Sequence, residues 1–346
     1  MHKRTRTTVL IVAVILLLLA GAVYLRKKAP PEAARLLPES DGIVYVNLRP
    51  VRAATHFDQR PVNHDADYQR FIDATGIQFE RDLDEAAFAL HRMTPSNGPN
   101  GSVGFSTVFV GRFDGKRLAG YLSSSATSTE EYQGHTIYNI PVQGRTDRVT
   151  LLGYDIVALS NMPTTEQIHS ILDRYRSAAL PFAGSSLLST HFPEVPLLSM
   201  AWGVGKIGML LGPPTSSDGA PVIAGGRDSL TSSLNVLGFS IPVPANATFI
   251  ASLRWTGSLH LRVEEIAADE ATAAAAADSL TSLVTMFRTG IDASRDSATA
   301  KDVRTLLDSI SVQHRKDRAT LTATIPAGLL ERLTDPPASS SQGTAP

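Results

Sequence analysis

The segments Thr248–Trp255 (TFIASLRW) and Ser258–Ile266 (SLHLRVEEI) decide the fold class of this 346-residue chain. Apolar and polar residues alternate along both, which predicts two strands with one buried face that pair as an antiparallel hairpin around Thr256-Gly257. A helix is predicted directly afterwards, over Asp269–Arg288, because acids stand in its first turn, an alanine run follows and Gly290 lies just beyond its end. The hairpin and helix together predict an α+β fold.

Strand and helix patterns recur on both sides of this hairpin. Runs of β-branched and aromatic residues bounded by turn residues predict further strands. Apolar residues at helical spacing, preceded by capping residues, predict further helices. The predicted strands are 42–48, 85–90, 106–113, 134–141, 148–152, 155–159, 311–313 and 319–325, and the predicted helices are 65–76, 115–122, 164–176, 300–309 and 327–333.

Each half of the chain runs from strands through a hairpin into a helix, which predicts two mainly antiparallel α+β domains with helices on one face of each sheet. The length of the chain is sufficient for two cores. The halves could be variants of one module, a hypothesis that a superposable pair of domains would support. The predicted division is 1–28 (basic n-region, transmembrane anchor and basic flank), 29–38 (proline-rich spacer), 39–180 (first domain), 181–196 (linker), 197–334 (second domain) and 335–346 (disordered tail).

The composition excludes several classes of protein. Apolar residues make up 43% of the chain and charged residues 19%, as in an ordinary globular protein. Lys and Arg number 32 against 33 Asp and Glu, so the chain lacks the basic field that nucleic-acid binding needs. The absence of cysteine excludes disulfides, thiol nucleophiles, cysteine-ligated zinc and a lipid anchor on cysteine.

An uncharged apolar segment near the N-terminus predicts a membrane anchor. Residues 7–25 carry no charge, and a helix of this length spans about 28 Å, the thickness of a bilayer's hydrocarbon core. Basic residues bracket it, which a buried helix of a soluble protein rarely shows. A short basic start favours a cytoplasmic N-terminus and an extracytoplasmic domain at the inner (plasma) membrane. Ala20-Gly21-Ala22 has the form that signal peptidase reads, so cleavage after Ala22, releasing a secreted protein, is the alternative.

One acidic and histidine-containing segment has the composition of a metal site. Five possible ligands fall within twelve residues, enough to bind a divalent cation if a loop folded them together. The alternative is a solvated surface loop in which Asp65 or Asp67 caps a helix, and we favour it, so no metal is expected. The five residues are His56, Asp58, His64, Asp65 and Asp67.

Three further patterns contain residue types found in catalytic or ligand-binding sites. His135, Asp155 and Ser160 have the residue types of a catalytic triad, but no nucleophile elbow surrounds Ser160, so we expect structural roles for them. Residues 219–227 are glycine-rich, but they lack the lysine of a phosphate-binding loop. Trp202 and Trp255 are expected to line the core or a groove rather than a ligand cage.

Several short motifs resemble a group of bacterial proteins. Leu36-Leu37-Pro38-Glu39-Ser40-Asp41 leads into a Val-Tyr-Val strand, and Phe113-Asp114-Gly115 and Gly134-His135-Thr136-Ile137-Tyr138 follow. These pieces resemble uncharacterised bacterial exported proteins that have a single N-terminal membrane anchor. The resemblance implies a bacterial envelope setting, and it carries no activity or functional residue.

The chain is therefore predicted to be a non-enzymatic, membrane-anchored extracytoplasmic protein. Residues 7–25 would contact the lipid bilayer, and the exported part would bind an envelope protein or polymer, with no cofactor and no nucleic acid. One alternative is a metal-dependent or serine-type envelope hydrolase. The other is a small-molecule binding or carrier protein, which would need a deep apolar pocket between the two halves.

Overall fold

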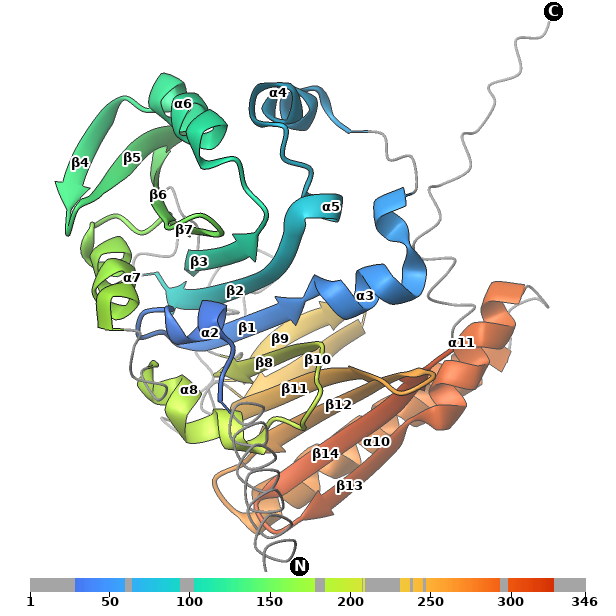
Figure 1. Cartoon of the computed structure of the whole chain (residues 1–346). Helices are drawn as coiled ribbons and strands as arrows, with labels where there is room; N and C mark the ends of the chain where they lie inside the picture. Colours follow the sequence, from blue (N-terminus) through green and yellow to red (C-terminus); the bar gives the residue numbers. More distant parts are fainter. Residues whose placement is uncertain are drawn as a thin grey trace, which may run out of the picture.

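A computed structural model describes residues 29–59, 64–93, 103–177, 184–206, 208, 231–236, 239–244, 247–292 and 298–326. Within them, one antiparallel sheet of twelve strands runs in the order β13-β14-β12-β11-β8-β1-β2-β3-β7-β6-β5-β4 (Figure 1). The strands are β1 (Gly42–Asn47), β2 (Leu83–Arg92), β3 (Val103–Gly111), β4 (Ser128–Tyr132), β5 (His135–Val142), β6 (Arg145–Leu152), β7 (Ile156–Ser160), β8 (Ala201–Gly205), β11 (Thr248–Trp255), β12 (Leu259–Ile266), β13 (Ser311–Arg315) and β14 (Arg318–Ile325).

The remaining elements cover or flank this sheet. A second hairpin consists of β9 (Thr231–Val236) and β10 (Phe239–Pro244). The helices are α2 (Glu32–Arg35), α3 (Leu48–Thr55), α4 (Ala66–Thr75), α5 (Phe79–Asp82), α6 (Gly115–Ser125), α7 (Glu166–Ser177), α8 (Ser186–His191), α10 (Glu270–Asp292) and α11 (Ala298–Ser309), with short 3-10 turns η1 (Phe57–Gln59) and η2 (Phe192–Glu194). The predicted α+β class is thereby confirmed, as is the hairpin of β11 and β12.

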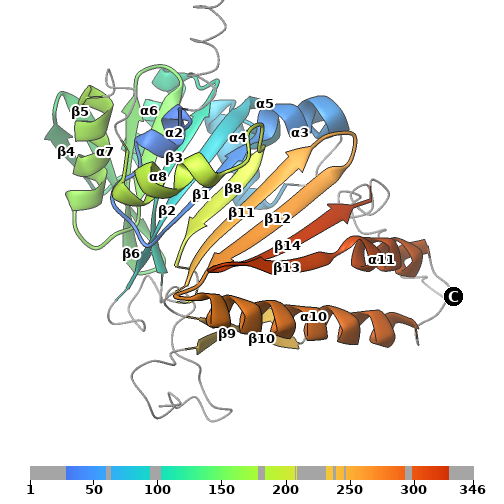
Figure 2. The same cartoon turned by 90° about the horizontal axis from the view of Figure 1, so that it is seen from below.

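Helices lie on both faces of the sheet, whereas the sequence predicted them on one. α2, α7 and α8 cover one face over the larger core, and α4 and α6 cover the opposite face over a smaller core. α10 and α11 pack against β13 and β14, on the side of the sheet away from α8 (Figure 2). Ile156, Val157 and Ala158 of β7 are consecutive and all buried, so this strand needs cover on both sides.

The two halves of the chain share this one sheet. β8, from the second predicted domain, pairs with β1 of the first on one side and with β11 on the other. The sheet is therefore continuous across the predicted boundary in the part of the chain that the structure describes. Hairpin alternation indicates which strand neighbours pair locally, but the β1–β8 pairing joins residues more than 150 positions apart and leaves no local pattern.

The predicted spacer and linker are both part of the folded body. Pro31 precedes α2 as its N-cap, and Ala33, Ala34, Leu36 and Leu37 are at most 1% exposed in the larger core. Proline cannot continue a helix but is compatible with a helix start, which is the role it has here.

The linker region contains α8, whose Leu188 is fully buried. Glu39, directly after the predicted spacer, connects this part of the chain to α8 and α7, because its carboxylate accepts hydrogen bonds from the backbone and hydroxyl of Ser186 and from Arg174.

The predicted anchor at residues 7–25 and the predicted helix at 327–333 lie outside the described residues. Among the helices that are described, none combines the length and the apolar character needed to cross a membrane.

Candidate ligand pocket

A pocket of about 590 Å³ opens where β1, β8 and the segment Phe192–Ser199 meet. Its floor is aromatic, and its walls are mostly proline, leucine, valine and alanine. Asn47, Ser199 and Tyr45 add polar atoms to this apolar lining. A pocket of this size and composition is typical of a small-molecule site. The lining residues are Ala29, Pro31, Tyr45, Asn47, Phe192, Pro193, Val195, Pro196, Leu197, Leu198, Ser199 and Trp202.

The aromatic floor follows from strand register. Tyr45 of β1 lies directly opposite Trp202 of β8, so both side chains point to the same face of the sheet. Their rings stack with centroids 5.4 Å apart, and Phe192 meets Trp202 edge to face, also at 5.4 Å. Tyr45 and Trp202 are only 3% and 4% exposed, so packing fixes the position of this floor.

The wall at Pro196–Ser199 is a tight turn. The backbone N–H and the hydroxyl of Ser199 both donate to the Pro196 carbonyl, at 3.3 Å and 2.6 Å. Leu198 takes a left-handed backbone conformation with φ of 65°. Beyond the turn, the Asn47 N–H donates to the Met200 carbonyl at 2.6 Å, which fastens the wall to β1.

A buried acid lies beside the floor. Glu85 of β2 is opposite Asn47 of β1 and hydrogen-bonds the Tyr45 hydroxyl. Burial raises the pKa of Glu85, although the hydrogen bond from Tyr45 and the charge of Arg49 oppose this shift. Burial also raises the pKa of Tyr45, and the neighbouring Glu85 reinforces the rise. The pair therefore offers a polar anchor point at the edge of an otherwise apolar pocket.

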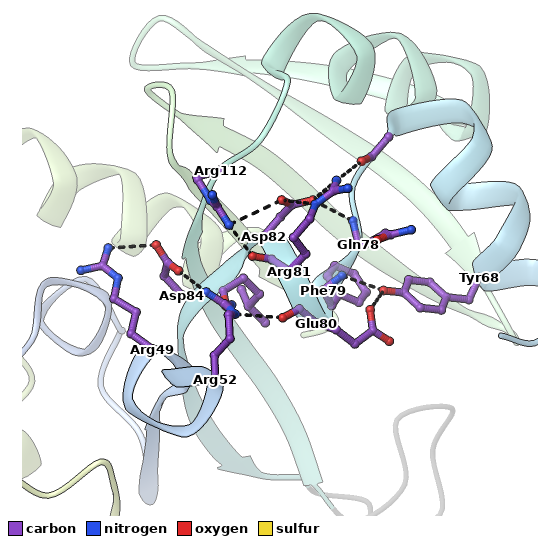
Figure 3. Close-up of polar contacts among 12 residues, drawn as sticks. Arg49, Arg52, Tyr68, Gln78, Phe79, Glu80, Arg81, Asp82, Asp84 and Arg112 are labelled. Carbon is purple, nitrogen blue, oxygen red and sulfur yellow. Dashed lines mark hydrogen bonds and ion pairs between the residues drawn. The ribbon is translucent and has the colours of Figure 1, made fainter. Parts of the chain in front are cut away.

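Arg49 connects this pocket to a larger polar network around α5 and the start of β2 (Figure 3). Its guanidinium pairs with Asp84 at 2.9 Å, and Arg52 pairs with the other Asp84 oxygen at 2.9 Å. Arg52 also donates to the carbonyls of Glu80, at 3.0 Å, and Leu83. Burial by itself raises the pKa of Asp84, but the hydrogen bonds from Arg52 and Arg49 outweigh it, and the net pKa is lowered. This network holds α3 against β2.

The five residues considered as metal ligands have separate roles. His56 ends α3 in a left-handed conformation, and Asp58 lies in η1. Asp65 caps α4 by accepting from the N–H groups of Asp67 and Tyr68, as the alternative interpretation predicted. Asp67 also pairs with Arg70 on the surface. In the part of the chain that the structure describes, no group of three His, Asp or Glu residues is placed to hold a metal ion.

His64 belongs to an aromatic cluster instead. Its Nε2 lies 3.2 Å from Glu80, which also accepts from the Tyr68 hydroxyl at 2.9 Å. Tyr68 stacks on Phe79 with ring centroids 5.2 Å apart and accepts from the Phe79 N–H (Figure 3). Burial raises the pKa of Tyr68 to about 12, and the carboxylate of Glu80 adds to this rise. The cluster fixes α4 to α5.

The three triad residues are not brought together. Ser160 ends β7 opposite Arg148, and its hydroxyl bonds Ser106 at 3.1 Å, in a chain that continues to His91. Asp155 is exposed just before the start of β7, about 16 Å of extended chain away from Ser160. His135 Nδ1 bonds the Leu151 carbonyl at 3.0 Å, near the Asp155 end. The three side chains therefore lie at separate points of β5, β7 and the turn before β7.

Sequence reasoning anticipated the burial of Trp202 but did not identify the pocket. Trp202 was expected to line a core or groove, and it does both, whereas Trp255 is 39% exposed at the end of β11. Tyr45 and Phe192 were missed as site residues, because the β1–β8 register brings Tyr45 to Trp202 and the tertiary packing of η2 brings Phe192 there. The glycine-rich residues 219–227 lie outside the described residues.

Comparisons with known proteins identify no family. No family model matches the chain, and no curated protein matches it. Crystal form III of TP0453 aligns over 88% of this chain and 98% of that chain, with 11% identity and a TM-score of 0.45. Crystal form I of TP0453 covers 89% of this chain and 96% of that chain, with 11% identity and a TM-score of 0.41. Structural similarity at this level assigns no function to this chain.

Proposed function

We propose that this chain is a membrane-anchored extracytoplasmic protein that binds an amphipathic small molecule without transforming it. The observation that carries the proposal is the aromatic pocket of Tyr45, Trp202 and Phe192. It lies at the junction of the two halves, where the carrier hypothesis needs it. Its floor would bury an apolar chain or ring, since burying apolar surface is favourable at about 25 cal/mol per Å².

The polar end of the ligand would lie toward Asn47 and the Tyr45–Glu85 pair. Asn47 can donate a hydrogen bond, the Tyr45 hydroxyl, whose own proton goes to Glu85, can accept one, and Arg49, whose side chain is 59% exposed, adds a positive charge nearby. A few polar groups at one end of an apolar pocket orient a ligand more than they strengthen its binding. The ligand class is therefore an amphiphile with one hydrogen-bonding head and one apolar part.

The anchor and the compartment are part of the same proposal. The uncharged segment 7–25 supports an uncleaved signal anchor with its N-terminus in the cytoplasm, and the resemblance to bacterial exported proteins agrees with that setting. Full-length protein that stays in the membrane fraction after alkaline extraction would support this topology. Release of a chain that begins after Ala22 would show instead that the signal is cleaved.

The two tryptophans of the chain provide a direct binding test. W255F leaves Trp202 in the pocket floor as the single tryptophan, and W202F leaves Trp255 as the matched control. The full chain is held in amphipol, so that no bilayer absorbs the probe, and titrated with 11-bromoundecanoate, whose bromine quenches on contact. We expect saturable quenching of W255F with about one probe per chain.

Two results separate pocket binding from non-specific partition of the probe. The W202F chain should show only weak quenching that rises linearly with probe. Adding S199F to W255F should abolish the saturable phase, because the ring would occupy pocket space lined by Ser199. Equal, non-saturating quenching of Trp202 and Trp255 would overturn the proposed function.

A further inference from the structure

Two adjacent leucines at the pocket mouth are exposed to solvent. Leu197 is 47% exposed and Leu198 is 78% exposed, in the turn that forms one wall of the pocket. The Leu198 backbone has a φ of 65°, a left-handed conformation that is unfavourable for a residue with a branched side chain. The two hydrogen bonds from Ser199 to the Pro196 carbonyl hold the turn in this shape. Leu197 and Leu198 thus form an apolar tip whose exposure to water is unfavourable.

The position of this tip relative to the predicted anchor is informative. Ala29 and Pro31 line the same pocket as Leu197 and Leu198. The predicted anchor ends at Leu25, so three residues separate it from Ala29, and the four steps from Leu25 to Ala29 span at most about 14 Å when fully extended. The mouth of the pocket must therefore lie close to the bilayer surface if residues 7–25 span the membrane.

The other large apolar side chains that are strongly exposed among the described residues do not share this position. They lie singly on separate elements, as is normal on protein surfaces. The most exposed of them, Tyr154, is 94% exposed in the turn between β6 and β7. The others are Val44, Phe79, Trp255 and Met286.

We propose that the turn Pro196–Ser199 inserts Leu197 and Leu198 into the interfacial region of the bilayer, so that the pocket opens against the membrane. This inference rests on the proposed function, since it uses the same pocket and the same anchor. It adds the partner surface, a lipid bilayer, and the route by which an amphiphile would reach the pocket. A ligand would then pass from the lipid leaflet to the aromatic floor without crossing water.

Because the sequence contains no cysteine, an introduced cysteine is the single site for thiol labelling. L198C in the full chain is labelled with an NBD dye and reconstituted into phosphatidylcholine liposomes that contain doxyl-labelled lipid near the headgroup end of the acyl chain. We expect the doxyl lipid to quench at least half of the NBD emission at position 198. L197C should behave in the same way and provides a second site if L198C does not fold.

Two matched controls separate insertion from simple proximity. Thr190 is exposed on α8, two residues from the pocket wall at Phe192. T190C therefore places a label at a polar surface position close to the pocket. Y154C reports a distant, equally apolar surface position. Labels at 190 and 154 should lose less than about a tenth of their emission.

The outcomes of the two experiments are distinguishable. Saturable quenching of Trp202 in amphipol, together with absent quenching at 197 and 198 in liposomes, would overturn the insertion of the turn and leave the proposed binding function standing. Equal quenching at 190 and 198 would also overturn it, because the whole domain would then lie against lipid. Quenching at 197 and 198 alone supports the proposal even where the bromine titration fails.

Discussion

At the scale of single residues, two neighbouring buried acids have opposite environments. Glu264 and Glu265 of β12 are both 6% exposed, but they point to opposite faces of the sheet. Glu264 accepts a hydrogen bond from Arg262 at 2.6 Å. Glu265 has an oxygen that finds no hydrogen-bond partner among the described residues, and burial raises its pKa. The charge on Glu265 is therefore a cost to the folded state.

We predict that E265Q stabilises the protein in a pH-dependent way. The folded pKa of Glu265 lies above its unfolded value, so its ionisation destabilises the fold progressively as the pH rises through the folded pKa. E265Q should raise the free energy of unfolding by about 1 kcal/mol at pH 8. Below pH 4 the acid is protonated in both states, so the difference should vanish. Urea unfolding at several pH values measures it.

E264Q is the matched control for that prediction. It removes the charge that pairs with Arg262, so it should lower the free energy of unfolding by about 0.5 to 1 kcal/mol at pH 8. If both E264Q and E265Q stabilised the protein, Glu264 and Glu265 would have similar environments, which would contradict the pairing of Glu264 alone.

At the scale of secondary-structure elements, one arginine fastens α3 to the start of β2. Arg52 has only 14% of its side chain exposed, and it donates to two backbone carbonyls and to Asp84. We expect R52A to lower the free energy of unfolding by about 2 to 3 kcal/mol, because it leaves these buried acceptors without a charged donor. Chemical denaturation of the full chain measures the change.

An arginine on the neighbouring helix provides the comparison. Arg70 pairs with Asp67 at i and i+3 on α4, with 76% and 84% of the two side chains exposed. R70A should change the free energy of unfolding by no more than about 0.5 kcal/mol, since exposed pairs contribute little. Equal effects of R52A and R70A would mean that the network in Figure 3 does not hold α3 in place.

Sequence patterns predicted most elements, and the failures share a cause. β11, β12 and α10 were predicted because alternation, caps and alanine content are local. α2 was read as spacer because two prolines precede it, although Leu36 and Leu37 are almost fully buried. Helical cover on both faces was missed as well. Which face a helix covers depends on long-range packing, which local periodicity does not contain.

At the scale of the whole molecule, a close approach between β1 and β8 joins the two halves. A Cβ atom added at Gly205 would lie 2.5 Å from the Gly42 Cα and 2.6 Å from the Asp41 carbonyl oxygen, both of them backbone atoms. Backbone cannot move aside as a flexible side chain can. Glycine at position 205 is therefore required for the pairing that makes one sheet and places Trp202 beside Tyr45.

We predict that G205A lowers the free energy of unfolding by about 1 to 3 kcal/mol, the range of overpacked cores. It should also weaken saturable quenching of Trp202, because the pocket floor depends on the β1–β8 register. G120A is the control, since nothing lies within 4 Å of that added Cβ in α6. It should stabilise by about 0.5 to 1 kcal/mol through helix propensity. Thermal and urea unfolding compare the two.

The sequence by itself determined the α+β class, most strands and helices, the hairpin of β11 and β12, and a helix cap at Asp65 or Asp67. Each depends on residues within a few turns or one hairpin of each other, where periodicity and capping act. Only the tertiary structure decided that both halves share one sheet and that Tyr45, Trp202 and Phe192 form a pocket. Those features depend on the register between strands that are far apart in the chain, and burial of the whole core selects that register.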